Sequence, residues 1–261
     1  MSRLIDLSAD LGEGFGSWQM GDDARLLPSL SSANVACGFH AGDPEIMRRT
    51  VTLCREHGVA IGAHPSFPDR VGFGRRTMQM SYDELYCDVL YQLGALGGFA
   101  RAAGVPVQHV SPHGRLGNLV VEDEAYARPV LDAIADVDDT LIVVTYSGTL
   151  ERLARERGLQ VGLMAFPDRA YEDDGTLVSR QQPDAVFHDT EEIADRARRM
   201  VETGTVRARS GATIDLDFDT VLLHGDNAES VTAAQHVRRV LEDAGVTIAP
   251  LAEVLEARPR E

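Results

Sequence analysis

Short runs of apolar residues recur along the chain, and most of them are rich in valine, leucine, isoleucine and alanine. Each run is a few residues long and stops at a cluster of polar, glycine or proline residues, which is typical of buried strands. The predicted strands are 4–7, 33–37, 59–63, 107–110, 141–144, 161–166 and 221–223.

Longer amphipathic segments separate these runs and carry residues that begin and end helices. Asp43 before Pro44 predicts a helix start, and Ser81 with Glu84 matches a capping box. Glycines close several of the segments, as expected for helix ends. The predicted helices are 44–58, 81–104, 122–135, 148–157, 190–203 and 228–244.

The alternation of strand and helix predicts the fold. Seven predicted strands that alternate with helices, together with a degenerate eighth strand at 246–249, indicate a single-domain, seven-stranded α/β barrel over residues 1–261. An open, doubly wound sheet would show the same periodicity, so the pattern leaves both architectures open.

Three segments interrupt the alternation. Residues 65–80 and 167–189 are long and rich in proline, glycine, aspartate and arginine, so we expect them to be loops over a site. Residues 205–219 predict a β-hairpin insertion with Ser210 and Gly211 at its turn.

Composition narrows the class of partner. The 261 residues include 25 Lys and Arg against 41 Asp and Glu, a net charge of −16, which disfavours nucleic acid and anionic membrane surfaces. We find no apolar run near the roughly 20 residues of a membrane span and no secretory signal. Three widely spaced cysteines suit a reducing compartment, so we expect a cytoplasmic protein.

Acidic residues and histidines gather where the predicted strands end. In a parallel barrel those ends share one face, where substrates bind. The residues concerned are Asp10, Glu13, His40, Asp43, His64, His113, Asp168, His224 and Asp226.

The eight histidines divide into two groups. A lone histidine after a strand is usually structural, but four on one predicted face, His40, His64, His113 and His224, favour a functional site. His109 is four residues before His113 and therefore falls on the same side of the strand. It points either into the barrel beneath the site or away from it. The other three are expected to be structural or solvated: His57, His188 and His236.

Carboxylates and arginines add two further candidate features. Asp10 and Glu13 are three residues apart in a turn that can aim both carboxylates at one point, although a capped N-terminal turn would look the same. Arg75 and Arg76 follow a Gly-Phe-Gly turn and suit a carboxylate or phosphate, unless they are solvated surface residues.

The same residue types suit a divalent metal, yet no metal-binding motif of specific spacing is present. The glycine-containing turns lack the lysine of a phosphate-binding loop. From the residues alone, we expect a hydrolytic or acid–base site at the mouth of a barrel.

Several motifs, in order along most of the chain, resemble the LamB/YcsF family. They are 6–16 (DLSADLGEGFG), 20–23 (MGDD), 31–44 (SSANVACGFHAGDP), 62–65 (GAHP), 72–76 (GFGRR), 168–171 (DRAY), 173–178 (DDGTLV) and 224–226 (HGD). The resemblance implies a seven-stranded barrel of the glycoside hydrolase and polysaccharide deacetylase type. It also implies the A subunit of an ATP-dependent 5-oxoprolinase, which opens the lactam of 5-oxo-L-proline to L-glutamate while ATP becomes ADP and phosphate. The B and C subunits of that enzyme would be its partners.

The chain departs from the family pattern at five positions, one of which is Arg115, where the family usually has Ala. Ser8 and Ala9 stand where the family usually has Asn and Cys, and Ser111 and Gly117 where it usually has Lys and Tyr. A cation and a phenol are therefore missing beside His113, and a related small lactam becomes an alternative substrate.

The candidate roles follow from the residues and the resemblance together. Asp10 or His113 is expected to act as the base, with His40, His64 and His224 around the reacting carbonyl or a metal. The catalytic candidates are Asp10, His40, His64 and His113; the substrate-binding candidates are Glu13, Asn34, Arg75, His224 and Asp226. Three alternatives remain: a metal-dependent amidase or deacetylase acting alone, a non-catalytic carbohydrate- or lactam-binding protein, and a scaffold subunit.

Overall fold

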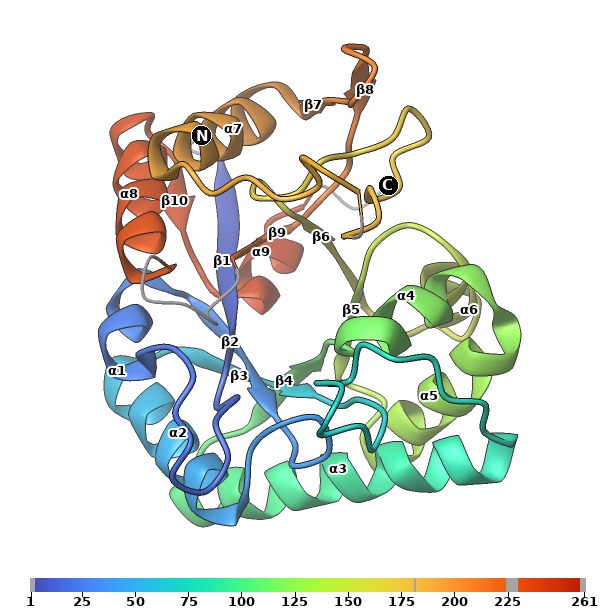
Figure 1. The fold of residues 1–261 in the computed structure, drawn as a ribbon. Coiled ribbons are helices and arrows are strands. Elements are labelled where there is room, and N and C mark those ends of the chain that lie inside the picture. Colours follow the sequence, from blue (N-terminus) through green and yellow to red (C-terminus); the bar gives the residue numbers. More distant parts are fainter. Residues whose placement is uncertain (1–2, 181, 224–229, 259–261) are drawn as a thin grey trace.

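Seven parallel strands close into a barrel in the computed structural model, which describes residues 3–180, 182–223 and 230–258 (Figure 1). The strands follow the order β1-β2-β3-β4-β5-β6-β9, and β9 pairs again with β1. This closure confirms the predicted barrel and excludes the open sheet. The strands are β1 (Leu4–Leu11), β2 (Ser32–Ala36), β3 (Ala60–His64), β4 (Val107–Val110), β5 (Ile142–Thr145), β6 (Val161–Ala165) and β9 (Thr220–Leu223).

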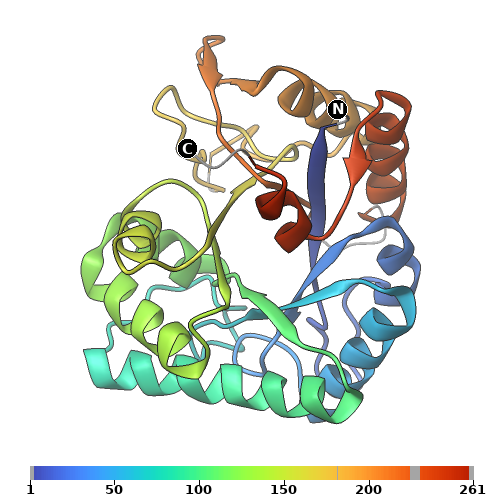
Figure 2. The ribbon, with the colours of Figure 1, turned by 180° about the vertical axis from the view of Figure 1, so that it is seen from behind.

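The helices surround the barrel on its outside (Figures 1 and 2), except for the last one, in which Leu251 packs against the inward-facing apolar residues of β5, β6 and β9. They are α1 (Asp23–Leu26), the 3-10 turn η1 (Leu27–Ser29), α2 (Pro44–His57), α3 (Tyr82–Ala103), α4 (Gly114–Glu122), α5 (Glu124–Val137), α6 (Thr149–Glu156), α7 (Thr190–Thr203), α8 (Ser230–Asp243) and α9 (Leu251–Glu256). Asp43 caps α2 and Ser81 opens α3 with a capping box, as predicted. Within the described ranges, no helix is both long and apolar enough to cross a bilayer.

Some boundaries differ from the prediction. The helix expected at 122–135 is α5, and it is preceded by a separate helix, α4, because Asp123 ends one helix and caps the next. Helix α4 was not predicted, because its first residue is Gly114, and a glycine at this point in the sequence indicates a turn. In the structure Gly114 has a left-handed φ of 57°. Strand β1 also runs on to Leu11. Ser8 and Asp10 point into the barrel, while Ala9 and Leu11, which alternate with them, pack outward.

The degenerate eighth strand and the hairpin both appear as short elements. β10 (Thr247–Ile248) pairs with the start of β1. β7 (Thr205–Arg207) and β8 (Thr213–Asp215) form a small antiparallel sheet at the predicted hairpin. The long segments 65–80 and 167–189 contain no regular helix or strand among their described residues, and both contribute side chains to the pocket described below.

The interior of the barrel has a polar half and an apolar half. Successive side chains in a strand point to opposite faces, and the outward-facing residues pack against the helices in the main core. On β1–β4 the inward positions are mostly polar: Asp6, Ser8, Asp10, Ser32, Asn34, His64 and His109. On β5, β6 and β9 most of them are apolar, namely Ile142, Val144, Met164 and Leu222, whereas Thr220 at the start of β9 is polar and hydrogen-bonds to Ser8 at 2.8 Å.

His109 lies inside the barrel, whereas the sequence left its direction open. It is 1% exposed, and its Nε2 donates to Asn34 Oδ1 at 2.8 Å. The imidazole fits because its neighbour on β3 is Gly62: a Cβ added there would lie 2.0 Å from His109 Nε2. The glycine therefore supplies the space that the buried histidine occupies.

We predict that Gly62→Ala lowers the free energy of unfolding by about 1–3 kcal/mol, because the methyl group overpacks the barrel against His109. The matched control is Gly94→Ala on α3, where nothing lies within 4 Å of an added Cβ and alanine should raise helix stability by up to about 1 kcal/mol. Chemical denaturation measures both. Equal effects of the two substitutions would contradict the packing argument.

We also predict a pH dependence that His109 controls. Burial, and then the nearby His64, lower the pKa of His109 to about 3, so the folded protein holds it neutral while the unfolded chain binds a proton below about pH 6.5. Its contribution therefore weakens as pH falls from about 6.5 towards 3, by up to about 1.4 kcal/mol per pH unit. Between pH 6.5 and 4, His109→Gln should lose unfolding free energy less steeply than the parent, and parallel curves would disprove this.

Candidate functional site

Five predicted site residues converge at the carboxyl ends of the first four strands. Asp10 lies near the end of β1, Glu13 in the turn after it, and His40 in the loop after β2. His64 is the last residue of β3, and His113 comes between β4 and α4. Parallel strands bring these ends to one edge of the barrel. The predicted juxtaposition is therefore observed.

The side chains of this cluster are in direct contact. His64 Nε2 lies 2.9 Å from His113 Nδ1 and 3.3 Å from Asp10 Oδ1. Glu13 Oε1 lies 3.0 Å from His40 Nε2 and 3.4 Å from His113 Nδ1. The rings of His40 and His113 are stacked, with centroids 3.8 Å apart.

Backbone carbonyls fix the orientation of two of the imidazoles. His64 Nδ1 donates to the Ser111 carbonyl at 2.5 Å, and His113 Nε2 donates to the Phe73 carbonyl at 2.9 Å. A carbonyl only accepts, so these outer nitrogens carry the hydrogens. In the neutral rings, the inner nitrogens then present lone pairs to the centre of the cluster.

The environment favours the neutral forms of His40 and His113. Burial, and then the neighbouring imidazoles His113 and His64, hold the pKa of His40 well below its usual range. Burial, and then His64, lower the pKa of His113 to about 3. Glu13 and these histidines offer nitrogen and oxygen atoms that all lie within 4.8 Å of one another. This donor set is suited to a divalent cation.

Asn34 holds Asp10 in place from below. Its side-chain amide donates to Asp10 Oδ1 at 2.9 Å, while its carbonyl oxygen accepts from His109. Asn34 is 1% exposed and lies beneath the pocket, so its contacts orient Asp10. His224 and Asp226, which were expected to bind substrate, lie outside the described residues.

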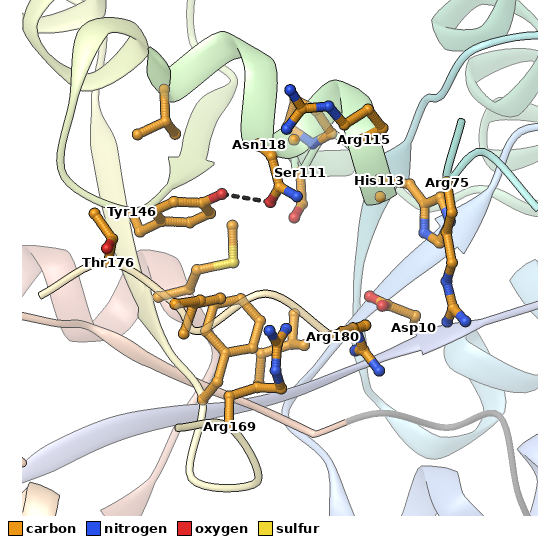
Figure 3. Close-up of a pocket in the computed structure, with 18 of the residues that line it drawn as sticks. Asp10, Arg75, Ser111, His113, Arg115, Asn118, Tyr146, Arg169, Thr176 and Arg180 are labelled. Carbon is orange, nitrogen blue, oxygen red and sulfur yellow. Dashed lines mark hydrogen bonds between the residues drawn. The ribbon is translucent and has the colours of Figure 1, made fainter. Parts of the chain in front are cut away.

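A pocket of about 680 Å³ extends from this cluster across the barrel mouth (Figure 3). Asp10, Glu13, His64 and His113 line its polar end. Tyr146, Met164, Phe166 and Leu222 line the other end, over the apolar half of the barrel. The pocket therefore has a polar end at β1–β4 and a less polar end over β5, β6 and β9.

Arginines bring positive charge to the pocket, although the chain as a whole is acidic. Arg75, Arg115, Arg169 and Arg180 all contribute to its lining. Arg169 is buried and donates to the carbonyls of Ala185 and Val178, and burial followed by the charge of Arg180 lowers its pKa to about 10. Asp10, Glu13 and Glu122 also line the pocket, so both signs of charge meet there in a chain of net charge −16.

The structure also shows what occupies the positions where the chain departs from its family. The Ser111 hydroxyl is buried in the pocket lining and has no hydrogen-bond partner among the described residues. A Cβ at Gly117 would lie 2.5 Å from the Pro112 carbonyl oxygen, so no side chain fits there without a backbone shift. A phenol does reach the pocket, from Tyr146, which donates to Asn118 Oδ1 at 2.6 Å.

Tyr146, Arg169 and Arg180 were not among the predicted site residues. Tyr146 directly follows β5, so the rule that strand ends carry the site applies to it as well. The two arginines come from segment 167–189, which was expected to cover a site but whose path the sequence does not define.

Comparisons with known proteins agree with this geometry. The LamB/YcsF family matches residues 5–256. A 5-oxoprolinase A subunit of Pseudomonas syringae pv. tomato is 49% identical over 251 residues, or 96% of this chain and 98% of that protein. The 5-oxoprolinase A subunit of Pyrococcus abyssi is 48% identical over 252 residues, or 96% and 99%.

A solved structure extends the likeness to three dimensions. The crystal structure of the lactam utilization protein from Thermus thermophilus matches with a TM-score of 0.89 and 46% identity, covering 94% of this chain and 98% of that one. The family match, the near-complete coverage and the shared barrel together show that this chain belongs to the LamB/YcsF family.

Proposed function

We propose that this chain is the A subunit of an ATP-dependent 5-oxoprolinase that hydrolyses 5-oxo-L-proline, or a closely related small lactam, to the open amino acid. The observation that carries the proposal is a buried carboxylate–histidine cluster at one end of an arginine-lined pocket. The names of the relatives at 48–49% identity agree with it.

The chemistry explains why ATP is needed. A lactam resists water because attack removes amide resonance, and transfer of the γ-phosphoryl group of ATP to the lactam oxygen releases ADP and activates the ring carbon. Water adds to that carbon and gives up a proton, and the C–N bond breaks as nitrogen takes a proton. A second water then releases phosphate from the acyl phosphate, leaving the free carboxylate. Each addition of water is accelerated by a positioned base.

Asp10 fits the role of base better than His113 does. Asp10 lines the pocket, and Asn34 fixes one of its carboxylate oxygens. His113 donates one ring N–H to the Phe73 carbonyl, its other ring nitrogen faces His64, and its pKa of about 3 leaves it a weak base. We assign His113 to holding the cluster together, and Arg75, in the pocket lining, to the carboxylate of the substrate.

Partner proteins complete the proposal. The sequence has no recognisable phosphate-binding loop, so we assign ATP binding to an assembly with the B and C subunits. The three cysteines, Cys37, Cys54 and Cys87, are free thiols, which agrees with a cytoplasmic location.

We predict that the isolated chain forms little glutamate from 5-oxoproline and ATP, and that addition of the B and C subunits restores turnover. Coupled assays of ADP and glutamate release measure this directly. Robust ATP-dependent turnover by the isolated chain would contradict the need for partners. Amide hydrolysis by the isolated chain without ATP would support the alternative of a metal-dependent amidase.

We predict that Asp10→Asn lowers turnover of the assembled enzyme by about a hundredfold or more, equivalent to about 2.7 kcal/mol of activation free energy, because the amide cannot take a proton from water. The unfolding midpoint should stay within a few degrees, since asparagine keeps the size of the side chain. Asp139→Asn, at an exposed position between α5 and β5, is the matched control and should keep full turnover. Normal turnover in Asp10→Asn would place the base elsewhere.

A further inference from the structure

Two lone pairs face each other at the centre of the histidine cluster. His64 and His113 each donate their outer N–H to a carbonyl, so the inner nitrogens, 2.9 Å apart, are both acceptors when the rings are neutral. Acceptors at this distance repel each other unless a proton or a cation lies between them. Both rings are buried, at 3% and 5% exposure.

The surrounding atoms have the spacing of a coordination shell. Ligand atoms about 2.1 Å from an ion lie roughly 3.0 Å apart in octahedral and roughly 3.4 Å apart in tetrahedral coordination. The separations are 2.9 Å between the two nitrogens and 3.4 Å between His113 Nδ1 and Glu13 Oε1. A metal-binding histidine also typically donates its other N–H to a carbonyl or carboxylate, and both histidines do so here.

We propose that a divalent transition-metal ion binds to His64 Nε2, His113 Nδ1 and the Glu13 carboxylate, with its remaining position open towards Asp10 and the pocket. Binding of the ion requires neither substrate nor partner proteins. Only the role of the ion in catalysis rests on the proposed function. Three protein ligands and an open position are the arrangement of a catalytic rather than a structural site. Such an ion supplies a Lewis acid for the carbonyl oxygen of the substrate.

Hydrogen-bond accounting assigns His40 a different role. Its Nδ1 is buried without a partner among the described residues. If Nε2 bound the ion, Nδ1 would carry a buried, unpaired N–H, which is costly. If Nε2 instead donates to Glu13 Oε1 at 3.0 Å, Nδ1 is only an unpaired acceptor. His40 is therefore a positioning residue that orients the ligand Glu13.

The donor types select the class of ion. Two imidazole nitrogens with a carboxylate suit Zn²⁺, Mn²⁺, Fe²⁺, Co²⁺ or Ni²⁺, whereas Mg²⁺ and Ca²⁺ prefer oxygen ligands alone. The first test is metal analysis of the purified chain by mass spectrometry, with roughly one transition-metal ion per chain expected. Chelator-treated protein should then take up Co²⁺ with a saturable visible absorption.

Variants test the ligand assignment. His64→Gln and Glu13→Gln should each lower Co²⁺ affinity by more than about a hundredfold, whereas His40→Gln, which keeps a donor for Glu13, should stay within about tenfold. His57→Gln, at an exposed position on α2, is the matched histidine control and should bind Co²⁺ as the parent does. Circular dichroism confirms that each variant is folded.

The wild-type chain alone can overturn the proposal. Metal content at trace level together with no saturable Co²⁺ signal would show that a shared proton, and not an ion, lies between His64 and His113. An effect of His40→Gln as large as that of His64→Gln would overturn the assigned ligand set. Both readouts are made without lactam, ATP or partners, so a failed oxoprolinase assay would leave them unchanged.

Discussion

A polar side chain inside a barrel costs free energy when it lacks a hydrogen-bond partner, and the arrangement of the candidate site depends on that constraint. On the β1–β4 half, Asn34 links His109 to Asp10, and Asp10 lies beside His64. His64 in turn contacts His113, and backbone carbonyls anchor both rings. Few of these groups can change direction without leaving another one unpaired, so the cluster is preorganised before any ligand arrives.

The loop after β3 is part of this arrangement and not a separate cover. Phe73, in a left-handed conformation with φ of 54°, presents its carbonyl to His113, and the Gly74 carbonyl accepts from the backbone of Arg115 at 2.9 Å. Phe73 also packs edge-on against the rings of His40 and His113. The loop that carries Arg75 thus contacts the same histidines that lie at the polar end of the pocket.

Local signals in the sequence were enough for most of the elements, though not for α4, and for the convergence of His40, His64 and His113. Asp43 marks its helix because a cap acts within a few residues, and His64 and His113 follow strands whose ends must share an edge. Contacts between distant segments could not be predicted from the sequence. Barrel closure, the inward direction of His109 and the placement of Arg180 all depend on packing between segments that are far apart in the chain. The role of Asn34 shows this most clearly, because its residue type is the same whether it binds a substrate or orients a neighbouring carboxylate.

The division of the barrel interior separates two tasks along the chain. The strands that hold the carboxylates and histidines come first, β1–β4, and those that form the apolar wall of the pocket come later, β5, β6 and β9. Substitutions at Met164, Phe166 or Leu222 can reshape the space for a ligand without touching the hydrogen bonds of the reacting end. Selection can therefore change which ligand the pocket admits in the second half of the gene while the machinery encoded in the first half is inherited intact.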